Sequence, residues 1–268
     1  MKKTTTTNPD VQPPEVSGQE TRTALLERAK RKAAPYRKTF VQAHRGGESR
    51  HGPLKRFVTN GNLRALKAYL ITVAACSSEN EDGWTTTLDS MTWARLFDTT
   101  LTTTDQSART AAWRTLKQLQ AMNLIRCSRP RSSTKISVTL LCEDGSGDEY
   151  TRPNGKAEAD RFLQIPIAFW VRGYDTQLDL PGLALLLAIA REKPWSQFPA
   201  ERAPEWYGWS ADTQLRGLQK LISLNLVERR ERYVKAPLSP TGSTLVYEYR
   251  LVASLRVRKS KATPAPAG

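Results

Sequence analysis

The chain has 268 residues, enough for two small domains plus tails, and carries a formal net charge of +15. No apolar run is as long as a membrane span, and no apolar stretch follows the first lysines, so neither a membrane protein nor a secretory signal is expected. The three cysteines are odd in number and show no Cys-x-x-Cys spacing, which favours a reducing cytoplasm. The two histidines are not close to any cysteine, so we expect no metal site.

The positive charge is concentrated in two segments that flank the body of the chain. Residues 22–56 contain eleven Lys or Arg against two Glu, and residues 256–261 contain four cations and no acid. Residues 1–20 have almost no apolar content. We therefore predict a disordered basic N-terminal arm over 1–56, with at most a short helix within 21–38, and a disordered basic C-terminal tail over 255–268. Arms of this charge are typical of proteins that follow a polyanion.

A first domain is predicted over residues 57–142. Asn62 is suited to cap a helix whose apolar side chains recur at helical spacing, and Asp89 is suited to cap a second one. The β-branched run Thr85-Thr86-Thr87 favours a strand between them. The order after this is a third helix over 106–122 and two strands over 124–127 and 135–142.

A second domain is predicted over residues 162–254, after an acidic and glycine-rich linker over 143–161. The apolar segment 162–170 contains Pro166 and is interpreted as an entry strand or as packing between the domains. Helices are then expected over 178–191, 200–207 and 210–224. Hairpin strands are expected over 226–235 and 245–252.

One segment of the chain occurs twice, about a hundred residues apart. The sequence from Thr110 to Arg126 aligns with the sequence from Asp212 to Glu228 without a gap. In each copy an amphipathic helix is followed by a short Asn-Leu step and then a hairpin. The positions that match are Leu116 with Leu218, Leu119 with Leu221, Asn123 with Asn225, and Leu124 with Leu226.

The polar face of the repeated helix is the candidate reading surface. Arg114 and Arg216 occupy equivalent positions, while Trp113 aligns with Leu215 and is interpreted as a core residue. Arg and Lys can contact guanine edges and Gln can contact adenine when a helix lies in the major groove. The candidate DNA-binding residues on the two helices are Thr110, Arg114, Lys117, Gln118, Arg216, Gln219 and Lys220.

The hairpins supply further candidates. Arg129, Arg131 and Lys135 lie at the tip of the first hairpin without a nearby acid in the sequence, and such a tip suits phosphates or a minor groove. In the second hairpin the run from Glu228 to Arg232 is mixed in sign. Strand alternation places Arg230 and Arg232 on one face, and part of this run is expected to form salt bridges.

The repeated helix, Asn-Leu step and hairpin resemble the tandem winged-helix DNA-binding proteins of bacteria. These include MarR-like and GntR-like regulators and the two-winged-helix plasmid replication initiators. The resemblance covers about residues 62–142 and 178–252 and implies a mainly α, α+β fold with two winged-helix (helix-turn-helix) domains in tandem. It implies groove-facing residues Arg114, Lys117, Arg216 and Lys220 and a basic wing formed by Arg129, Arg131 and Lys135.

From these observations we expect a cytoplasmic, nucleoid-associated protein that binds double-stranded DNA, with a homodimer as one option. Transcription regulation is the first expectation, and a plasmid or mobile-element replication initiator that binds origin repeats is the closest alternative. A protein or RNA interaction module built on winged helices is a further one. No phosphate loop, catalytic histidine or carboxylate cluster is recognised, so no enzyme activity, catalytic residue, metal or cofactor is expected.

Overall fold

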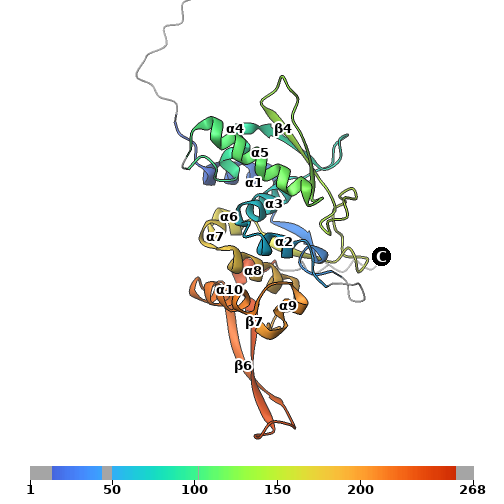
Figure 1. Cartoon of the computed structure of the whole chain (residues 1–268), viewed down its shortest axis with the longest axis vertical. Helices are drawn as coiled ribbons and strands as arrows, with labels where there is room; N and C mark the ends of the chain where they lie inside the picture. The colour runs from blue at the N-terminus through green and yellow to red at the C-terminus, as the bar shows by residue number, and fades with distance from the viewer. Residues whose placement is uncertain (1–13, 44–49, 102, 258–268) are drawn as a thin grey trace, which may run out of the picture.

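A computed structural model describes residues 14–43, 50–101 and 103–257 of the chain, which form a mixed α+β structure. The molecule is elongated, with one β-hairpin at each end and helices between them (Figure 1). Within the described residues no helix is both long and apolar enough to cross a membrane.

The first repeated unit contains three helices and a three-stranded antiparallel sheet with the strand order β2-β4-β3. The predicted caps are confirmed: the side chain of Asn62 accepts a hydrogen bond from the Ala65 amide, and that of Asp89 accepts one from the Met91 amide. The elements are α3 (Leu63–Ala75), β2 (Thr85–Asp89), α4 (Ser90–Leu96), α5 (Asp105–Ala121), β3 (Ile125–Ser128) and β4 (Lys135–Leu140).

The second unit follows the same order of helices but has a longer hairpin. Its strands β6 and β7 pair over nine residues each, and a single bridge from Ser196 to Tyr249 occupies the place that β2 has in the first unit. Helix α10 packs tightly on α8 because Gly217 has no side chain; a Cβ there would lie 2.5 Å from the Pro181 carbonyl oxygen. The elements are α8 (Leu180–Arg191), η2 (Ala200–Arg202), α9 (Ala203–Trp206), α10 (Ala211–Ser223), β6 (Val227–Lys235) and β7 (Ser243–Leu251).

The Asn-Leu step has the same backbone conformation in both units. Asn123 and Asn225 are left-handed, with φ of 58° and 52°. In each unit the following leucine amide donates back into the helix, Leu124 to the Leu119 carbonyl and Leu226 to the Leu221 carbonyl. Asparagine adopts this conformation at lower cost than other residues with a side chain, so it ends each helix and turns the chain into the hairpin.

These asparagines provide a test of the repeat. Replacing Asn123 or Asn225 with Ala should lower the free energy of unfolding by about 1 kcal/mol, while Gly at the same position should cost less. Chemical denaturation of the purified variants measures both effects. Equal losses for Ala and Gly would contradict a conformational role for these residues.

The segment predicted as a disordered arm over 1–56 is folded over most of its described length, so that prediction was wrong for 17–43 and 50–56. Ser17 caps α1 (Gly18–Ala29) in a capping box with Glu20. The reason is that apolar side chains between the cations are buried in the main core. A count of charges does not detect these side chains. The elements are α1, β1 (Ala33–Arg37), η1 (Lys38–Phe40) and α2 (Leu54–Thr59), and the buried residues include Leu26, Tyr36, Phe40, Leu54 and Phe57. Residues 1–13 and 44–49 lie outside the description.

The acidic segment 143–161 is not a flexible linker, which is a second correction. Glu143 is completely buried and accepts a hydrogen bond from Arg37 in β1 at 2.5 Å. Arg37 also binds Asp160 at 2.9 Å and donates to the Thr151 carbonyl. Both ends of the segment are therefore tied to the N-terminal strand, because a buried charge needs a partner of opposite sign.

The joint between the two units is built from the N-terminal segment and the apolar residues that follow 161. β5 (Phe162–Pro166) pairs antiparallel with β1, so Ala33 lies opposite Pro166 at one end of this two-stranded sheet. Two short helices follow, α6 (Ala168–Val171) and α7 (Tyr174–Gln177), and α1 packs against α3, α4 and α6. At the C-terminal end η3 (Ala253–Leu255) buries Leu255; residues 258–268 of the predicted tail are outside the description.

Candidate nucleic-acid interface

Helix α5 separates an apolar face from a cationic one. Ala112, Leu116 and Leu119 are fully buried, while Arg114 and Lys117 are exposed on the opposite side. No carboxylate of the described residues lies within 4 Å of either cation. These two side chains therefore carry uncompensated charge on a rigid helix.

The other predicted residues of α5 are more constrained. Thr110 is half-buried and its hydroxyl donates to the Gln106 carbonyl at 2.9 Å. Gln118 is exposed, and its Oε1 accepts a hydrogen bond from Asn62 at 3.0 Å. Trp113 is half-buried rather than fully in the core, and the Lys117 ammonium lies 4.8 Å from its ring centre. Stacking on the indole holds the Lys117 amine in place while leaving it accessible.

The first hairpin places its cations at the end of the molecule. Arg129, Arg131 and Lys135 are all exposed, and none has an acid within 4 Å among the described residues. Asp89 lies opposite Lys135 in the β2–β4 ladder, but its carboxylate accepts from the Met91 amide. The hairpin tip thus continues the positive surface of α5.

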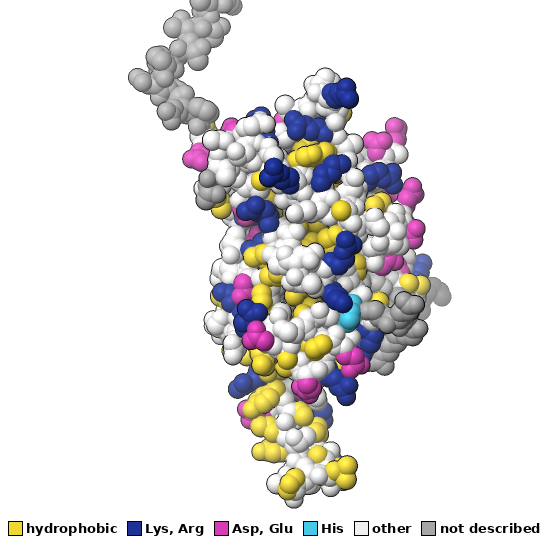
Figure 2. All heavy atoms as spheres, viewed as in Figure 1, with side chains coloured by type: hydrophobic (Ala, Val, Ile, Leu, Met, Phe, Trp, Pro, Cys, Tyr) yellow, Lys and Arg dark blue, Asp and Glu magenta, His cyan; other side chains and the backbone are white. Residues whose placement is uncertain are grey.

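Two further cations extend this surface and were missed because they fall in the segment predicted to be disordered. Arg56 of α2 donates to the Ala121 carbonyl at the end of α5, and Lys55 lies beside Gly208 of the second unit. Figure 2 shows Lys and Arg side chains over α5 and along the same face below it. The helical spacing of Leu54, Phe57 and Val58 was the signal that could have placed α2 here.

The two cations of α10, Arg216 and Lys220, are more engaged by neighbouring residues than the cations of α5. Arg216 is paired with Asp212 of the same helix at 2.9 Å. The stem of Lys220 lies against Gly182 of α8, so part of its length is covered by the neighbouring helix. Gln219 is exposed. The two copies therefore match in backbone, while only the first presents an unpaired cation at the position that Arg114 and Arg216 share.

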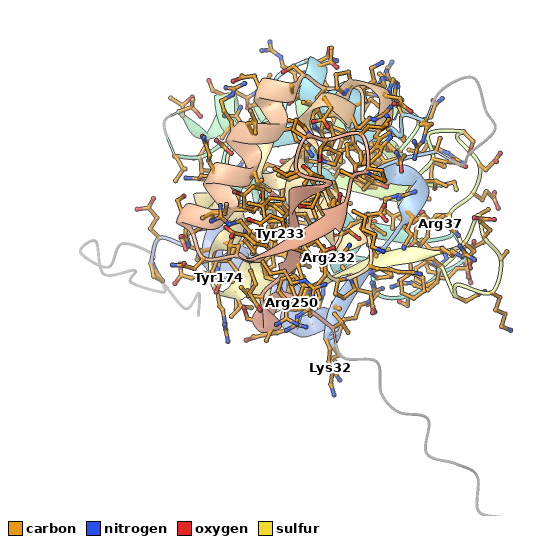
Figure 3. The ribbon with its side chains drawn as sticks, turned by 90° about the horizontal axis from the view of Figure 1, so that it is seen from below. Lys32, Arg37, Tyr174, Arg232, Tyr233 and Arg250 are labelled. Atoms are coloured by element: carbon orange, nitrogen blue, oxygen red, sulfur yellow. The ribbon has the colours of Figure 1, made fainter. Side chains whose placement is uncertain are left out.

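Most cations of the second hairpin are also paired with carboxylates, the exception among the described residues being Lys235. Arg230 and Arg232 both pair with Glu248, at 2.6 and 2.8 Å, and Arg250 pairs with Glu228 at 2.5 Å. Hydrogen bonds from the two arginines lower the pKa of Glu248, so it stays ionised at neutral pH. The expectation of salt bridges in this run is thus confirmed. Figure 3 shows Arg232, Tyr233 and Arg250 on this hairpin, seen from its end of the molecule.

The second unit also exposes large apolar side chains on α10 and on its hairpin. Leu215 and Ile222 of α10 are 51% and 40% exposed, and Tyr233 of the hairpin is 73% exposed. Hydrophobic side chains gather along this hairpin in the space-filling view (Figure 2). The two ends of the molecule therefore differ in chemistry: the first carries cations without a carboxylate partner among the described residues, and the second combines exposed apolar side chains with arginines that are paired with carboxylates.

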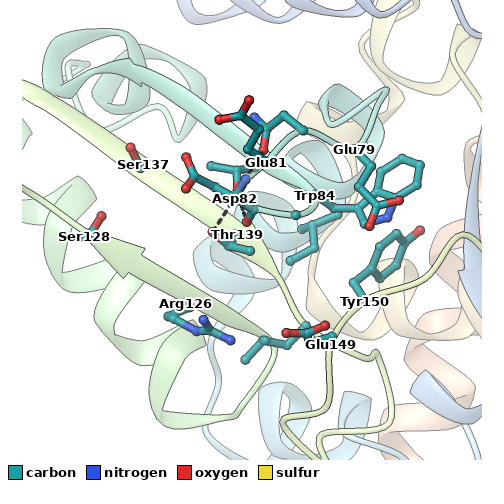
Figure 4. A pocket seen from close by; sticks show the side chains of 15 residues that line it. Glu79, Glu81, Asp82, Trp84, Arg126, Ser128, Ser137, Thr139, Glu149 and Tyr150 are labelled. Carbon is teal, nitrogen blue, oxygen red and sulfur yellow. Dashed lines mark hydrogen bonds between the residues drawn. The ribbon is translucent and has the colours of Figure 1, made fainter.

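An acidic pocket of about 520 Å³ lies beside the sheet of the first unit (Figure 4). Glu79, Glu81, Asp82 and Glu149 line it, and Arg126 lies on the same side as Glu149, across from Glu81 and Asp82. Within the described part of the chain no group of three or more His, Cys, Asp or Glu side chains is arranged to hold a metal ion. Carboxylates repel phosphates, so this pocket marks a side of the first unit that a nucleic acid would avoid.

No family model, curated protein or solved structure matches this chain.

Proposed function

We propose that this protein binds double-stranded DNA through the first repeated unit, with α5 in the major groove and the β3–β4 hairpin beside it. The observation that carries the proposal is the set of cations on α5, on its hairpin and on α2 that have no carboxylate partner among the residues that the structure describes. A helix is the element that fits a major groove, and a basic hairpin next to it suits the adjoining backbone. The helix–strand–helix–helix–hairpin order is the arrangement of a winged helix.

The second unit is proposed as a second winged helix with a smaller electrostatic share in binding. Its Arg216, Arg230 and Arg232 are engaged by carboxylates, so contact with a phosphate would first require these pairs to open. Gln219 and the exposed part of Lys220 are the side chains of α10 best placed for polar contacts. The proposed cellular role is a regulator of transcription, with replication initiation as the alternative that uses the same contacts.

Competition binding is the direct test. A labelled duplex bound to the full chain should be displaced by unlabelled duplex at lower concentration than by structured RNA of equal charge. Footprinting of genomic fragments then separates the two roles, because a regulator protects a promoter and an initiator protects iterated repeats. Displacement by RNA at the lower concentration would contradict the proposal.

A second candidate function, self-association, is favoured by the apolar side of the second unit. Among the described residues, strands β6 and β7 pair only with each other, apart from the Ser196 bridge, so strand edges remain open, and Tyr233 of β6 and Leu215 of α10 are exposed. A second copy of this chain could pair along such an edge. Light scattering of the wild type and of Tyr233→Glu tests this, and a monomer at all concentrations for both proteins excludes it.

A further inference from the structure

A cavity of about 700 Å³ lies between α1, α3 and α4 on one side and α6 and α7 on the other. Figure 1 shows α6 and α7 in the middle part of the molecule, with α1 and α4 above them. No described residue of α5 or of either hairpin lines the cavity. It is therefore a separate site from the proposed DNA-binding surface, and its size is that of a pocket for a small molecule.

One wall of the cavity holds a buried carboxylate that lacks a full set of partners. Asp175 of α7 is 4% exposed, and its Oδ2 pairs with Arg22 Nε at 3.2 Å. Its Oδ1 is buried and accepts no hydrogen bond from any described residue. Arg22 is itself only partly engaged, because its Nη1 donates to Asp98 and to the Leu96 carbonyl while its buried Nε makes no hydrogen bond among the described residues.

A buried carboxylate oxygen without a donor is costly, so its presence in a cavity points to a donor that arrives with a ligand. An ammonium group is the donor that best matches a carboxylate, since the hydrogen bond is then assisted by charge. Asp175 thus defines one end of the ligand.

The same cavity contains an unpaired cation. Lys67 of α3 is half-buried, and none of the described carboxylates lies within 4 Å of it. Burial lowers the pKa of Lys67, while Asp175 and Asp98 oppose this change. Arg64, one turn earlier on α3, lies exposed at the rim. A ligand carboxylate would satisfy the Lys67 ammonium.

The rest of the lining is largely apolar. Ile71, Leu96, Phe97 and Trp170 line it with aliphatic and aromatic groups that are each 4% exposed or less, and Leu101 is 74% exposed. Such walls favour a flat aromatic or compact aliphatic body. We propose that this cavity binds a small aromatic zwitterion, with its ammonium on Asp175, its carboxylate on Lys67 and its ring against Phe97 and Trp170.

Isothermal titration of the full chain with four related compounds tests the proposal without reference to DNA. The probes are tryptophan, tryptamine, indole-3-propionate and indole, which carry both charges, the amine alone, the carboxylate alone and neither. Tryptophan should bind most tightly and indole least. Absence of heat with all four probes would overturn the proposal, as would indole binding as tightly as tryptophan.

Two variants that each remove one charge test which residue binds the ammonium group and which binds the carboxylate. Asp175→Asn should weaken tryptophan and tryptamine by about 10-fold or more and leave indole-3-propionate nearly unchanged. Lys67→Gln should give the opposite pattern, weakening the two compounds with a carboxylate. Equal effects of both variants on all four probes would indicate a general change in the cavity and contradict the assigned contacts.

A variant that fills the cavity, compared with a matched control, tests the site even if the Asp175→Asn variant does not fold. Thr176 and Gln177 are adjacent and exposed, and both donate to the Gly173 carbonyl, but only Thr176 lines the cavity. Thr176→Trp should abolish tryptophan binding, while Gln177→Trp should retain it. Wild-type affinity in Thr176→Trp would place the ligand outside this cavity.

Discussion

A triple charge reversal on the first unit, Arg114→Glu, Lys117→Glu and Arg131→Glu, is expected to lower duplex affinity by about 100-fold or more at moderate salt. The three side chains are exposed and have no carboxylate partner among the described residues, so each is free to neutralise a phosphate or to bind a base. The slope of log affinity against log salt should also flatten, by about 0.9 for each phosphate that the variant no longer neutralises. Fluorescence anisotropy over a salt series measures both quantities.

The matched control reverses the same number of charges elsewhere. Arg28, Arg172 and Lys193 are exposed and lie outside α5 and both hairpins. Their reversal should reduce affinity only through the change in net charge, which salt screens. Equal losses for the two triple variants would show that the α5 surface has no special role.

The two copies should differ in the same assay. Arg114→Ala should cost about 1–3 kcal/mol on a cognate site, and Arg216→Ala should cost less. The reason is that Arg216 is already paired with Asp212, and this ion pair must open before the guanidinium can bind DNA. A larger loss for Arg216→Ala would mean that the ion pair opens on DNA and that the second unit reads the sequence.

The largest effect on stability is expected at the Arg37–Glu143 pair. Replacing Arg37 with Met leaves a completely buried carboxylate without its cation, which should lower the free energy of unfolding by about 3–5 kcal/mol. The double variant Arg37→Met with Glu143→Leu should recover much of this loss, because the completely buried carboxylate is removed and only the partly exposed Asp160 is left without Arg37. Urea denaturation of the three proteins gives the comparison.

The loss should depend on pH. Burial raises the pKa of Glu143 above its ordinary value of 4.5, and Arg37 opposes this rise. Without Arg37 the pKa of the folded state should rise further, so the folded protein holds a proton that the unfolded chain releases. The contribution of Glu143 to stability is then full below pH 4.5, the pKa of the unfolded chain, and is lost as pH rises through the higher pKa of the folded state. The Arg37→Met variant should therefore have a lower free energy of unfolding at about pH 8 than at about pH 5.

An exposed pair on the same segment provides the control. Arg161 and Glu158 are 3.5 Å apart, with side chains 61% and 73% exposed. Arg161→Met should change stability by less than about 1 kcal/mol at either pH. A comparable loss in this control would show that the segment 143–161 is held by something other than the buried pair.

Local patterns in the sequence were sufficient to predict most elements of the two repeated units. Asn62, Asp89 and Ser210 cap the helices that their side chains and the following apolar periodicity indicate. The Asn-Leu step predicts the end of α5 and α10, because asparagine adopts the left-handed conformation that such an ending uses. These features depend on a few neighbouring residues, so they can be recognised without a tertiary structure.

The tertiary structure alone decided what the charged segments do. Arg22 and Arg37 belong to a run of cations that composition describes as a solvated arm, yet both are buried against carboxylates that lie 76 and 106 residues away in the chain. It also decided that Arg114 has no carboxylate partner within the described part of the chain while Arg216 is paired, although the two positions are equivalent in the repeat. The pairing of charges and the burial of an arm depend on contacts between distant segments of the chain. Local sequence patterns do not predict which of these segments are in contact.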